Sequence, residues 1–298
     1  MLTPEQLKER KKGIGGSDAG PILGISLWRT PLDIYRSKLG LEEPKKQEIW
    51  HWVGHQVEKG VLIPYYEMKY ERTLSFPDTY RHKDYDWMLA NVDALDGNII
   101  VECKNCGNFK DDRFWGKEGT DEIPLQYMAQ AAHYMEVLDL NTVVFVVLFG
   151  GNLIEEFILH RDKGRLEGFS KVMIEKEQYF WEEHVLKQIP PEPKTLDDIT
   201  KLFPYAVERK TIEADDDTFN KVKRFIHLDI KSKQIKKKSD EIKLDLLYTM
   251  KDAEILEFGN EAILTHKNVS GKCKDHRRVH IPLNFKRRME PCLEEDPN

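Results

Sequence analysis

The fold is decided by residues 91–105, which read Asn-Val-Asp-Ala-Leu-Asp-Gly-Asn-Ile-Ile-Val-Glu-Cys-Lys-Asn. Its turn signal, Asp96-Gly97-Asn98, predicts a β-hairpin because these residue types tolerate positive φ. Side chains alternate along a strand, so Glu102 and Lys104 share one face. If the turn centres on Gly97-Asn98, Asp93 lies directly across from Glu102, with Cβ atoms about 5 Å apart. This face therefore gathers two carboxylates and an ammonium group in an otherwise apolar hairpin.

The chemistry of this face indicates a metal-dependent phosphodiesterase site. Neighbouring acids in apolar surroundings are costly unless a cation bridges them. Mg²⁺ prefers one or two carboxylates with water and substrate phosphate in its other positions, and Mn²⁺ is a substitute. Lys104 is then placed to orient the attacking water or to neutralise charge developing on phosphorus. The alternative is a surface hairpin with an ordinary cross-strand ion pair, which is common and stabilises little.

A glycine-rich stretch lies upstream, at residues 13–20, Gly-Ile-Gly-Gly-Ser-Asp-Ala-Gly. It predicts a tight loop that enters a short helix at or before Pro21, with Ser17 or Asp18 as the N-cap. A helix start fed by a glycine loop favours anions such as phosphate. A plain helix cap is the alternative.

Two predicted helices carry further polar side chains. Residues 50–67 show apolar residues at helical spacing, and Glu58 adjoins that stripe, so it can be half-buried and face the hairpin. Residues 123–138 place Gln126, Gln130 and His133 on one helix face, which suits contacts to a substrate backbone or to the water shell of a metal. Ordinary solvent-facing side chains are the alternative in both helices.

Taken together and in this order, these segments closely resemble the YqaJ-type viral recombinase family, the relatives of lambda exonuclease among the PD-(D/E)xK nucleases. The matching motifs are Gly13-Ile-Gly-Gly-Ser-Asp18, the helix with Gly54 and Glu58, Met88-Leu-Ala-Asn-Val-Asp93 followed by Glu102-Cys-Lys104, and Gln126-Tyr-Met-Ala-Gln130. The resemblance covers residues 8–160. One departure is Val92, which stands where the motif usually has proline.

The resemblance implies a role for each matching residue. Asp93, Glu102 and Glu58 would form the metal-binding and catalytic acids, with Lys104 as the catalytic lysine and the backbone carbonyl of Cys103 as a further ligand. The implied contacts to DNA and its 5′-phosphate come from Arg10, Ser17, Gln126 and Gln130.

The resemblance also implies an activity and a setting. The expected protein is a Mg²⁺-dependent exonuclease that degrades linear double-stranded DNA from 5′ ends, exposing single strand for phage-type recombination. A homo-oligomeric ring, a single-strand annealing protein as partner and the bacterial host cytoplasm follow from the same resemblance. An endonuclease on the same core and a non-catalytic DNA-end-binding scaffold are the alternatives.

Composition fits a protein of this kind without specifying it. A hydrophobic content of 40% and a charged content of 33% predict a soluble globular chain. No apolar run approaches the roughly 18 residues of a membrane span, so no membrane contact is expected. The net charge of −6 means that contacts to DNA must come from local basic patches or metal ions. The chain has four cysteines, of which Cys103 and Cys106 have Cys-x-x-Cys spacing, and no second pair has this spacing. This pattern argues against a disulfide framework or a zinc site.

The pattern of elements predicts an α/β (α+β) fold with a restriction-endonuclease-like core, a mixed central sheet flanked by helices, over residues 1–188. Within it, strands are expected near 68–76, 86–95, 99–105, 142–149 and 154–160, and helices over 122–139 and 161–186. A proline-containing linker is expected at 189–214. Residues 215–298 predict a coiled-coil-like helix to about 257, a terminal basic β-hairpin and an acidic tail.

Overall fold

A computed structural model describes residues 9–42, 49–107, 110–111, 114–258, 262–269 and 276–280. The chain divides into two compact units, Met1–Ala206 and Val207–Asn298. The predicted hairpin and the motifs around it all belong to the first unit. The acidic tail predicted at residues 290–298 lies outside the described residues.

The centre of the first unit is a four-stranded mixed sheet in the order β4-β5-β6-β7. Its strands are β4 (Ala94–Asp96), β5 (Ile99–Cys106), β6 (Thr142–Phe149) and β7 (Leu153–His160). Only β5 and β6 run parallel, and the other two pairs are antiparallel. Strand β6 is buried from its second residue to its last, as its continuous apolar sequence predicts for a central strand.

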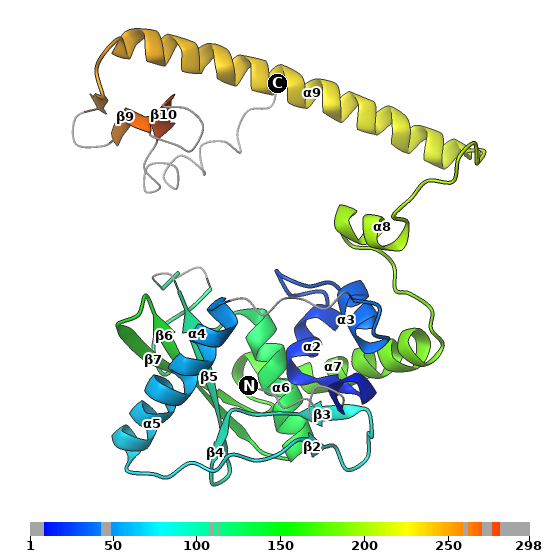
Figure 1. Cartoon of the computed structure of the whole chain (residues 1–298), viewed down its shortest axis with the longest axis vertical. Helices are drawn as coiled ribbons and strands as arrows, with labels where there is room; N and C mark the ends of the chain where they lie inside the picture. The colour runs from blue at the N-terminus through cyan, green and yellow to red at the C-terminus, as the bar shows by residue number, and fades with distance from the viewer. Residues whose placement is uncertain are drawn as a thin grey trace. The chain divides into compact units, whose positions relative to one another are not determined.

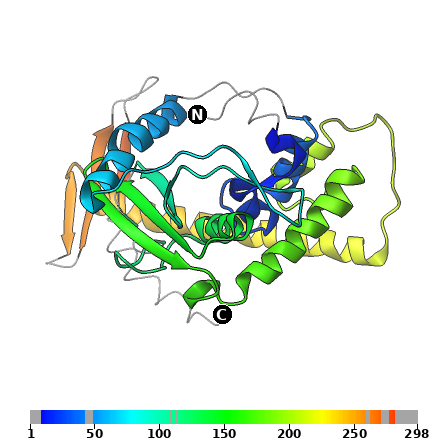
Figure 2. The same ribbon diagram turned by 90° about the horizontal axis from the view of Figure 1, so that it is seen from below.

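Helices cover both faces of this sheet, as Figures 1 and 2 show. Because side chains alternate along β5, Ile100 packs in the cluster that contains α6 (Leu125–Leu138), and Val101 packs against the opposite layer. That opposite layer is formed by α4 (Ile49–Val57), the π-helical turn η2 (Glu58–Leu62) and α5 (Ile63–Tyr70). Glu102 therefore lies on the α6 side of the sheet.

A smaller sheet in the order β1-β3-β2 connects the N-terminal motif to the core. Its strands are β1 (Ile14–Gly15), β2 (Tyr80–Arg81) and β3 (Met88–Ala90). The turn η1 (Arg10–Lys12) precedes β1, and α2 (Gly16–Ile22) and α3 (Pro31–Lys38) follow it. Because β1 pairs with β3, the glycine-rich loop is held beside the segment that leads to Asp93.

The first unit ends in helical segments: η3 (Gly164–Leu166), α7 (Phe169–Tyr179), the π-helical η4 (Phe180–Leu186) and α8 (Leu196–Leu202). Helix α8 is attached to α3 through polar contacts. The hydroxyl of Thr30 donates to the fully buried Asp198 over 2.8 Å, and Lys201 donates to Asp33 over 2.5 Å. Part of the segment predicted as a linker therefore folds with the first unit.

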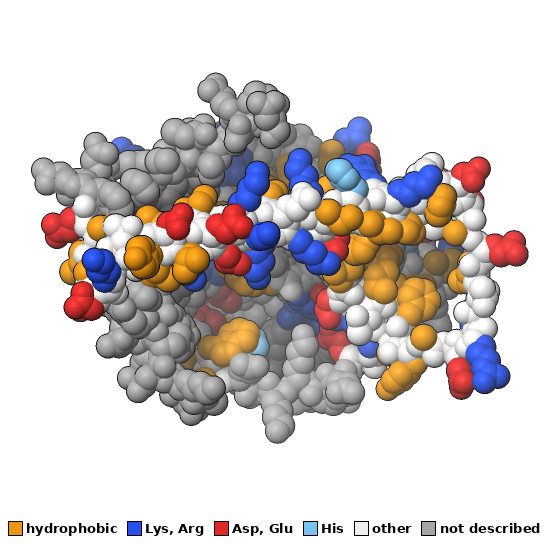
Figure 3. Space-filling view, turned by 90° about the horizontal axis from the view of Figure 1, so that it is seen from above, with side chains coloured by type: hydrophobic (Ala, Val, Ile, Leu, Met, Phe, Trp, Pro, Cys, Tyr) orange, Lys and Arg blue, Asp and Glu red, His pale blue; other side chains and the backbone are white. Residues whose placement is uncertain are grey.

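The second unit contains α9 (Asp216–Met250) and an antiparallel sheet in the order β10-β9-β8. Its strands are β8 (Ile255–Phe258), β9 (Ala262–Val269) and β10 (His276–His280). Figure 3 shows hydrophobic, basic and acidic side chains interspersed along the side of α9 that faces the viewer. Among the helices that the structure describes, none has the length and apolar character needed to cross a membrane.

Several predicted element boundaries are wrong. No strand forms over 68–76: α5 continues to Tyr70, because Tyr66 extends the buried helical stripe, and only an isolated bridge at Ser75 joins this segment to the sheet. The strand predicted at 86–95 is two strands, β3 and β4, in different sheets. The helix predicted from Arg161 starts at Phe169, since Gly164 and Gly168 adopt positive φ before it.

The predicted coiled-coil helix is also shorter than expected. It ends at Met250, and Lys251 adopts a positive φ of 50°. Leu256, which lies within the range predicted for the helix, instead pairs with Leu264 in the sheet. The terminal hairpin is present as β9 and β10, with β8 added at its edge.

Candidate active site

The carboxylate pair is positioned by the hairpin of β4 and β5. Ala94 pairs with Val101 and Asp96 with Ile99, so continuing this register places Asp93 opposite Glu102, as predicted. Oδ2 of Asp93 accepts a hydrogen bond of 2.8 Å from the backbone N–H of Cys103. The chain passes from one sheet to the other just before Asp93, which brings this side chain to the end of the strand pair.

Glu102 is almost completely buried, with 3% of its surface exposed. Its Oε1 accepts hydrogen bonds from Lys104 over 2.8 Å and from the side-chain amide of Gln130 over 2.7 Å. Its Oε2 is buried and accepts no hydrogen bond from the described residues. A buried carboxylate oxygen without a donor is unusual and points to a missing positively charged partner.

The electrostatics of the pair agree with this view. Burial, followed by the charge of Asp93, raises the pKa of Glu102 to about 7, although Lys104 opposes the shift. Burial also raises the pKa of Asp93 to about 6, with a further contribution from Glu58 and opposition from Lys104. The ammonium group of Lys104 therefore supplies too little positive charge to balance Asp93, Glu102 and Glu58.

Lys104 lies between the acids and α6. Its Nζ donates to Glu102 and to Oε1 of Gln130 over 3.1 Å, and it lies 4.9 Å from the centre of the Tyr127 ring. Burial works to lower the pKa of Lys104, but the charges of Glu102 and Asp93 outweigh it and hold that pKa above its ordinary value. Lys104 is therefore a cation at neutral pH, able to donate hydrogen bonds but not to accept a proton.

The third predicted acid comes from the π-helical turn η2. Glu58 is half-buried, as expected, and its Oε2 lies 3.1 Å from Nδ1 of His55. Burial raises the pKa of Glu58, and the charge of Glu102 adds to the shift. This mutual effect places Glu58 in the same electrostatic group as the hairpin acids.

These side chains open onto a pocket of about 410 Å³. The predicted residues among those lining it are Arg10, Ser17, Glu58, Asp93, Glu102 and Gln130. Lys104 lies behind Glu102 through its hydrogen bond. The structure therefore brings the N-terminal motif, the η2 acid, the hairpin and α6 together around one cavity.

The wall formed by the N-terminal motif differs from the sequence-based expectation in one respect. Neither Ser17 nor Asp18 is the N-cap of α2, because Gly15 occupies that position; Asp18 lies in the first turn, and its Oδ2 accepts from the backbone N–H of Gly15 over 3.0 Å. Ser17 instead accepts a hydrogen bond from Nη2 of Arg10 at the pocket wall. Gly16 is required here because a Cβ would lie only 2.5 Å from the ring of Tyr134.

The predicted polar stripe of α6 does not act as one surface. Gln130 lines the pocket, but Gln126 is not among the lining residues, and its side chain accepts from the backbone N–H of Leu27 over 3.4 Å. His133 is fully buried and contacts Glu177 and the carbonyl oxygen of Leu89, each over 3.0 Å. The three side chains therefore neither share one face toward a substrate nor all point to solvent as ordinary surface residues.

Two contributors to the site were missed from the sequence. Tyr134 receives a hydrogen bond of 3.0 Å from Gln130 and donates one of 2.9 Å to the backbone carbonyl of Asn91. It lies four residues after Gln130, so the same helical spacing that selected Gln130 could have identified it. His55 is the second, three residues before Glu58 on the same helical run.

The donor set fits a hard divalent cation. Mg²⁺ is held in proteins by one or two carboxylates together with water and phosphate, and Asp93 and the unsatisfied Oε2 of Glu102 provide such oxygens. Within the described residues, no three His, Cys, Asp or Glu side chains are arranged to hold a metal ion by themselves. Water and substrate would therefore have to complete the coordination.

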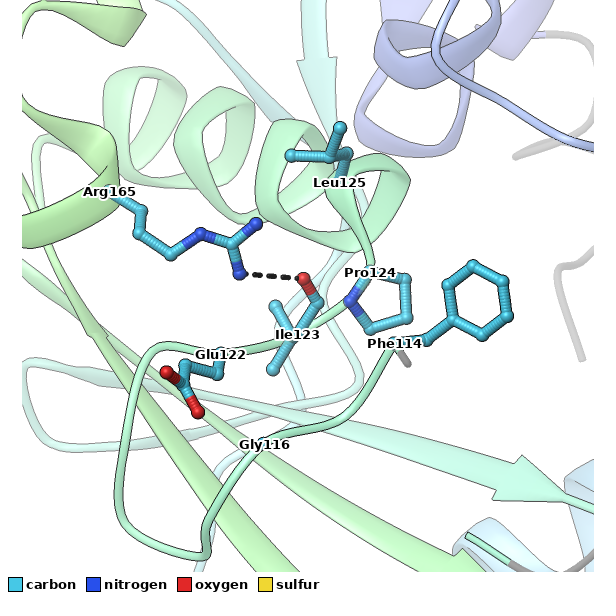
Figure 4. A pocket seen from close by; sticks show the side chains of 7 residues that line it. All are labelled: Phe114, Gly116, Glu122, Ile123, Pro124, Leu125 and Arg165. Atoms are coloured by element: carbon cyan, nitrogen blue, oxygen red, sulfur yellow. Dashed lines mark hydrogen bonds between the residues drawn. The ribbon is translucent and has the colours of Figure 1, made fainter. Parts of the chain in front are cut away.

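A second cavity of about 550 Å³ lies at the N-terminal end of α6 (Figure 4). Its lining residues are Phe114, Gly116, Glu122, Ile123, Pro124, Leu125 and Arg165. Arg165 donates to the backbone carbonyl of Ile123 over 3.0 Å and to that of Asp121 over 3.3 Å. This guanidinium holds the loop together, and Glu122 is the single acid among the described residues that line the cavity, so this lining does not resemble the carboxylate site.

Comparison with known proteins supports the sequence-based resemblance. The sequence model of the YqaJ-like viral recombinase domain matches residues 5–141. An uncharacterized protein YqaJ from Bacillus subtilis strain 168 is 28% identical, over 96% of this chain and 93% of its own length. The predicted resemblance to this family is therefore confirmed.

A solved structure shows the same fold. A putative exonuclease from Eubacterium rectale has a TM-score of 0.51 at 15% identity, over 72% of this chain and 96% of its own. An alkaline exonuclease from Laribacter hongkongensis gives a TM-score of 0.48 at 15% identity, over 63% and 94% of the two chains. The predicted restriction-endonuclease-like fold, a mixed sheet flanked by helices, is confirmed.

Proposed function

Because residues 5–141 match the sequence model of the YqaJ-like viral recombinase domain, we propose that this protein is a Mg²⁺-dependent exonuclease acting on linear double-stranded DNA from 5′ ends. The observation that carries the proposal is the buried Oε2 of Glu102, which accepts no hydrogen bond from the described residues and lies beside the ionisable Asp93. A cation at this position would remove the electrostatic cost of both acids. Mn²⁺ is the expected substitute, since it accepts the same oxygen ligands.

The residues that would hold the metal are Asp93 and Glu102, with Glu58 completing the acidic group and the backbone carbonyl of Cys103 as a further ligand. Bound Mg²⁺ supplies charge stabilisation at the phosphodiester and lowers the pKa of a bound water. Gln130 keeps one oxygen of Glu102 occupied, so that Oε2 remains directed to other partners. The cleavage chemistry thus depends on a carboxylate that α6 holds in a fixed orientation.

Lys104 contributes as a fixed positive charge. Its pKa is held above the ordinary value by Glu102 and Asp93, after opposing burial, so it does not act as the general base. Its contacts to Glu102 and Gln130 leave the third ammonium hydrogen to orient the attacking water or to stabilise charge on the phosphoryl oxygens.

Attack from a DNA end is supported by the wall that the N-terminal motif contributes to the same pocket. Arg10 and Ser17 line this wall and are hydrogen-bonded to each other. A guanidinium and a hydroxyl suit a terminal phosphate, which offers several acceptor oxygens. We assign the 5′-phosphate to these two residues, so that a duplex end is held while the adjacent phosphodiester faces the acids.

Exposed single strand would then be the product used in phage-type recombination. The single-strand annealing partner, the ring-shaped homo-oligomer and the bacterial cytoplasm remain predictions from the family resemblance. An endonuclease on the same core is the second candidate in the same class. A non-catalytic end-binding scaffold is disfavoured, because binding alone gives no reason to gather Asp93, Glu102 and Lys104 around one site.

The test uses the full-length protein with linear duplex labelled separately at its 5′ and 3′ ends. With Mg²⁺ or Mn²⁺, early release of the 5′ label is expected, and EDTA should stop it. Covalently closed circular duplex should remain intact, and Asp93→Asn serves as the inactive control. Cleavage of the circle would favour the endonuclease, whereas the absence of any metal-dependent cleavage, with intact binding to DNA ends, would favour the scaffold.

A further inference from the structure

A buried cation lies directly behind the proposed phosphate subsite. Lys38, the last residue of α3, has only 4% of its side chain exposed. Its Nζ donates to Oδ2 of Asp18 over 2.6 Å and to the backbone carbonyl of Arg10 over 2.8 Å. Burying a lysine is costly, and removing one partner of a buried pair leaves an uncompensated charge. Neither the carboxylate site nor the metal accounts for this lysine.

The ion pair of Lys38 and Asp18 fixes the backbone of both segments that form this pocket wall. Asp18 accepts from the backbone N–H of Gly15, which fixes the loop that presents Ser17. The carbonyl bonded by Lys38 belongs to Arg10, so the backbone of that residue is fixed as well. The guanidinium of Arg10 lies along Gly15, where an added Cβ would be 3.7 Å from its Nε.

Distances show which cation neutralises Asp18. Nζ of Lys38 lies 2.6 Å from this carboxylate, whereas Nη2 of Arg10 lies 4.0 Å away and donates to Ser17. Burial works to raise the pKa of Asp18, but Lys38 and then Arg10 hold it well below its ordinary value. Asp18 is therefore an anion, and without Lys38 the nearest remaining cation would be Arg10.

We propose that Lys38 is a positioning residue that keeps Arg10 available for the terminal phosphate by neutralising Asp18 in its place. This inference rests on the proposed function, because it assigns Arg10 and Ser17 to the 5′-phosphate. Loss of the Lys38 charge turns the Arg10 guanidinium from the pocket toward Asp18. The consequence is a loss of end discrimination, while the acids that cleave the phosphodiester are unchanged.

The test compares Lys38→Gln with the double variant Asp18→Asn/Lys38→Gln. Glutamine keeps a hydrogen-bond donor for the Arg10 carbonyl but removes the charge, and the double variant also removes the pull of Asp18 on Arg10. Affinity for blunt duplex with a 5′-phosphate or a 5′-hydroxyl is measured by fluorescence anisotropy without divalent metal. KM and kcat with Mg²⁺ are measured on both duplexes.

Lys38→Gln is expected to weaken binding of the phosphorylated duplex about tenfold, the effect of losing one charge-assisted contact. Binding of the hydroxyl duplex should stay within about twofold, and the kinetic loss should appear in KM. The double variant should regain most of the preference. Equal weakening on both ends, or unchanged preference in a folded Lys38→Gln protein, would overturn the proposal.

If Lys38→Gln does not fold, the test uses the double variant Asp18→Asn/Lys38→Gln. This variant is expected to keep its preference for the 5′-phosphorylated over the 5′-hydroxyl duplex, and loss of that preference would overturn the proposal. Arg10→Ala separates this inference from the proposed function. If Arg10→Ala leaves end preference intact, the phosphate subsite itself is wrong, and the role of Lys38 falls with it. If Arg10→Ala abolishes the preference and Lys38→Gln has no effect, only the role of Lys38 is overturned.

Discussion

Asp18 and Glu102 are equally buried, each with 3% of its surface exposed, and each accepts a hydrogen bond from a lysine. Their pKa values nevertheless move in opposite directions. That of Asp18 lies far below its ordinary value, and that of Glu102 is raised to about 7. Burial cannot explain the difference because it acts on both in the same sense.

The difference lies in the count of neighbouring charges. Around Asp18, two cations, Lys38 and Arg10, surround one acid. Around Glu102, one cation, Lys104, is shared with Asp93. The first cluster, Asp18 with Lys38 and Arg10, has its charges balanced within the protein and holds a loop; we call it the complete cluster. The second, Glu102 and Asp93 with Lys104, lacks positive charge, and we call it the deficient cluster. A lack of positive charge is the property of a site that binds a cation together with its substrate.

The largest expected effect follows from removing charge at the deficient cluster. Glu102→Gln keeps the size of the side chain but removes a metal-binding charge, so cleavage should fall by several orders of magnitude while DNA binding survives. Single-turnover cleavage of 5′-phosphorylated duplex and anisotropy on the same duplex measure the two properties.

The matched control for this comparison is Asp18→Asn, an equally conservative change at the complete cluster. It should lower stability and weaken end binding far more than it lowers the rate on bound DNA. Near-normal cleavage by Glu102→Gln would mean that the hairpin is structural and that the active site lies elsewhere.

The two lysines should also differ in the step that they affect. Lys104→Ala removes the only cation hydrogen-bonded to Glu102 among the described residues, so the chemical step should slow about 10²–10³-fold. The loss should be the same on 5′-phosphate and 5′-hydroxyl ends, because the described hydrogen bonds of Lys104 go to Glu102 and Gln130 and not to Arg10 or Ser17. Rates at saturating DNA measure the effect. An effect on KM alone would show that Lys104 only binds DNA.

Much of the deficient cluster could be predicted from the sequence because it depends on local periodicity. A two-residue alternation and a turn signal were enough to place Asp93 opposite Glu102 and Lys104 on the same face. The half-buried position of Glu58 followed from helical spacing in the same way. These relations are fixed by the geometry of one helix or one hairpin.

The complete cluster could not be predicted, because it depends on tertiary contacts across separate elements. Lys38 reaches Asp18 from another helix, and no pattern in the sequence connects the two. Helical spacing also misled for α6, since His133 and Gln126 share spacing with Gln130 but meet different neighbours. Periodicity shows which side chains share a face, whereas the packed neighbours decide what the face contacts.

The free energy of unfolding should depend on pH because too little positive charge surrounds Asp93 and Glu102. In the metal-free protein, Asp93 and Glu102 have pKa values raised to about 6 and about 7. The stability that they contribute is therefore present below about pH 4 and lost as pH rises through 6 to 7. Mg²⁺ binds the ionised form, so its stabilising effect should be large at pH 8 and small at pH 5.

Thermal melts at these two pH values, with Mg²⁺ or EDTA, test this expectation. Each kcal/mol of stabilisation should raise Tm by about 2–4 °C for a chain of this size class. Asp93→Asn should melt higher than the wild type in EDTA at pH 8 and should lose most of the response to Mg²⁺. An equal response to Mg²⁺ at both pH values, or in Asp93→Asn, would contradict binding at these acids.

The smallest effect is expected at Ser17, which belongs to the wall held by the complete cluster. Its hydroxyl accepts from Arg10, and the start of α2 is held by the bond between Asp18 and the N-cap residue Gly15, so Ser17→Ala should change Tm little. The variant loses one hydroxyl contact to a terminal phosphate, and the preference for 5′-phosphorylated over 5′-hydroxyl duplex should fall about three- to tenfold. Rates on both end types and a melting curve measure this. A lowered Tm with equal loss on both ends would show that Ser17 supports the helix start after all, and the wall would then rely on Arg10 alone for the phosphate.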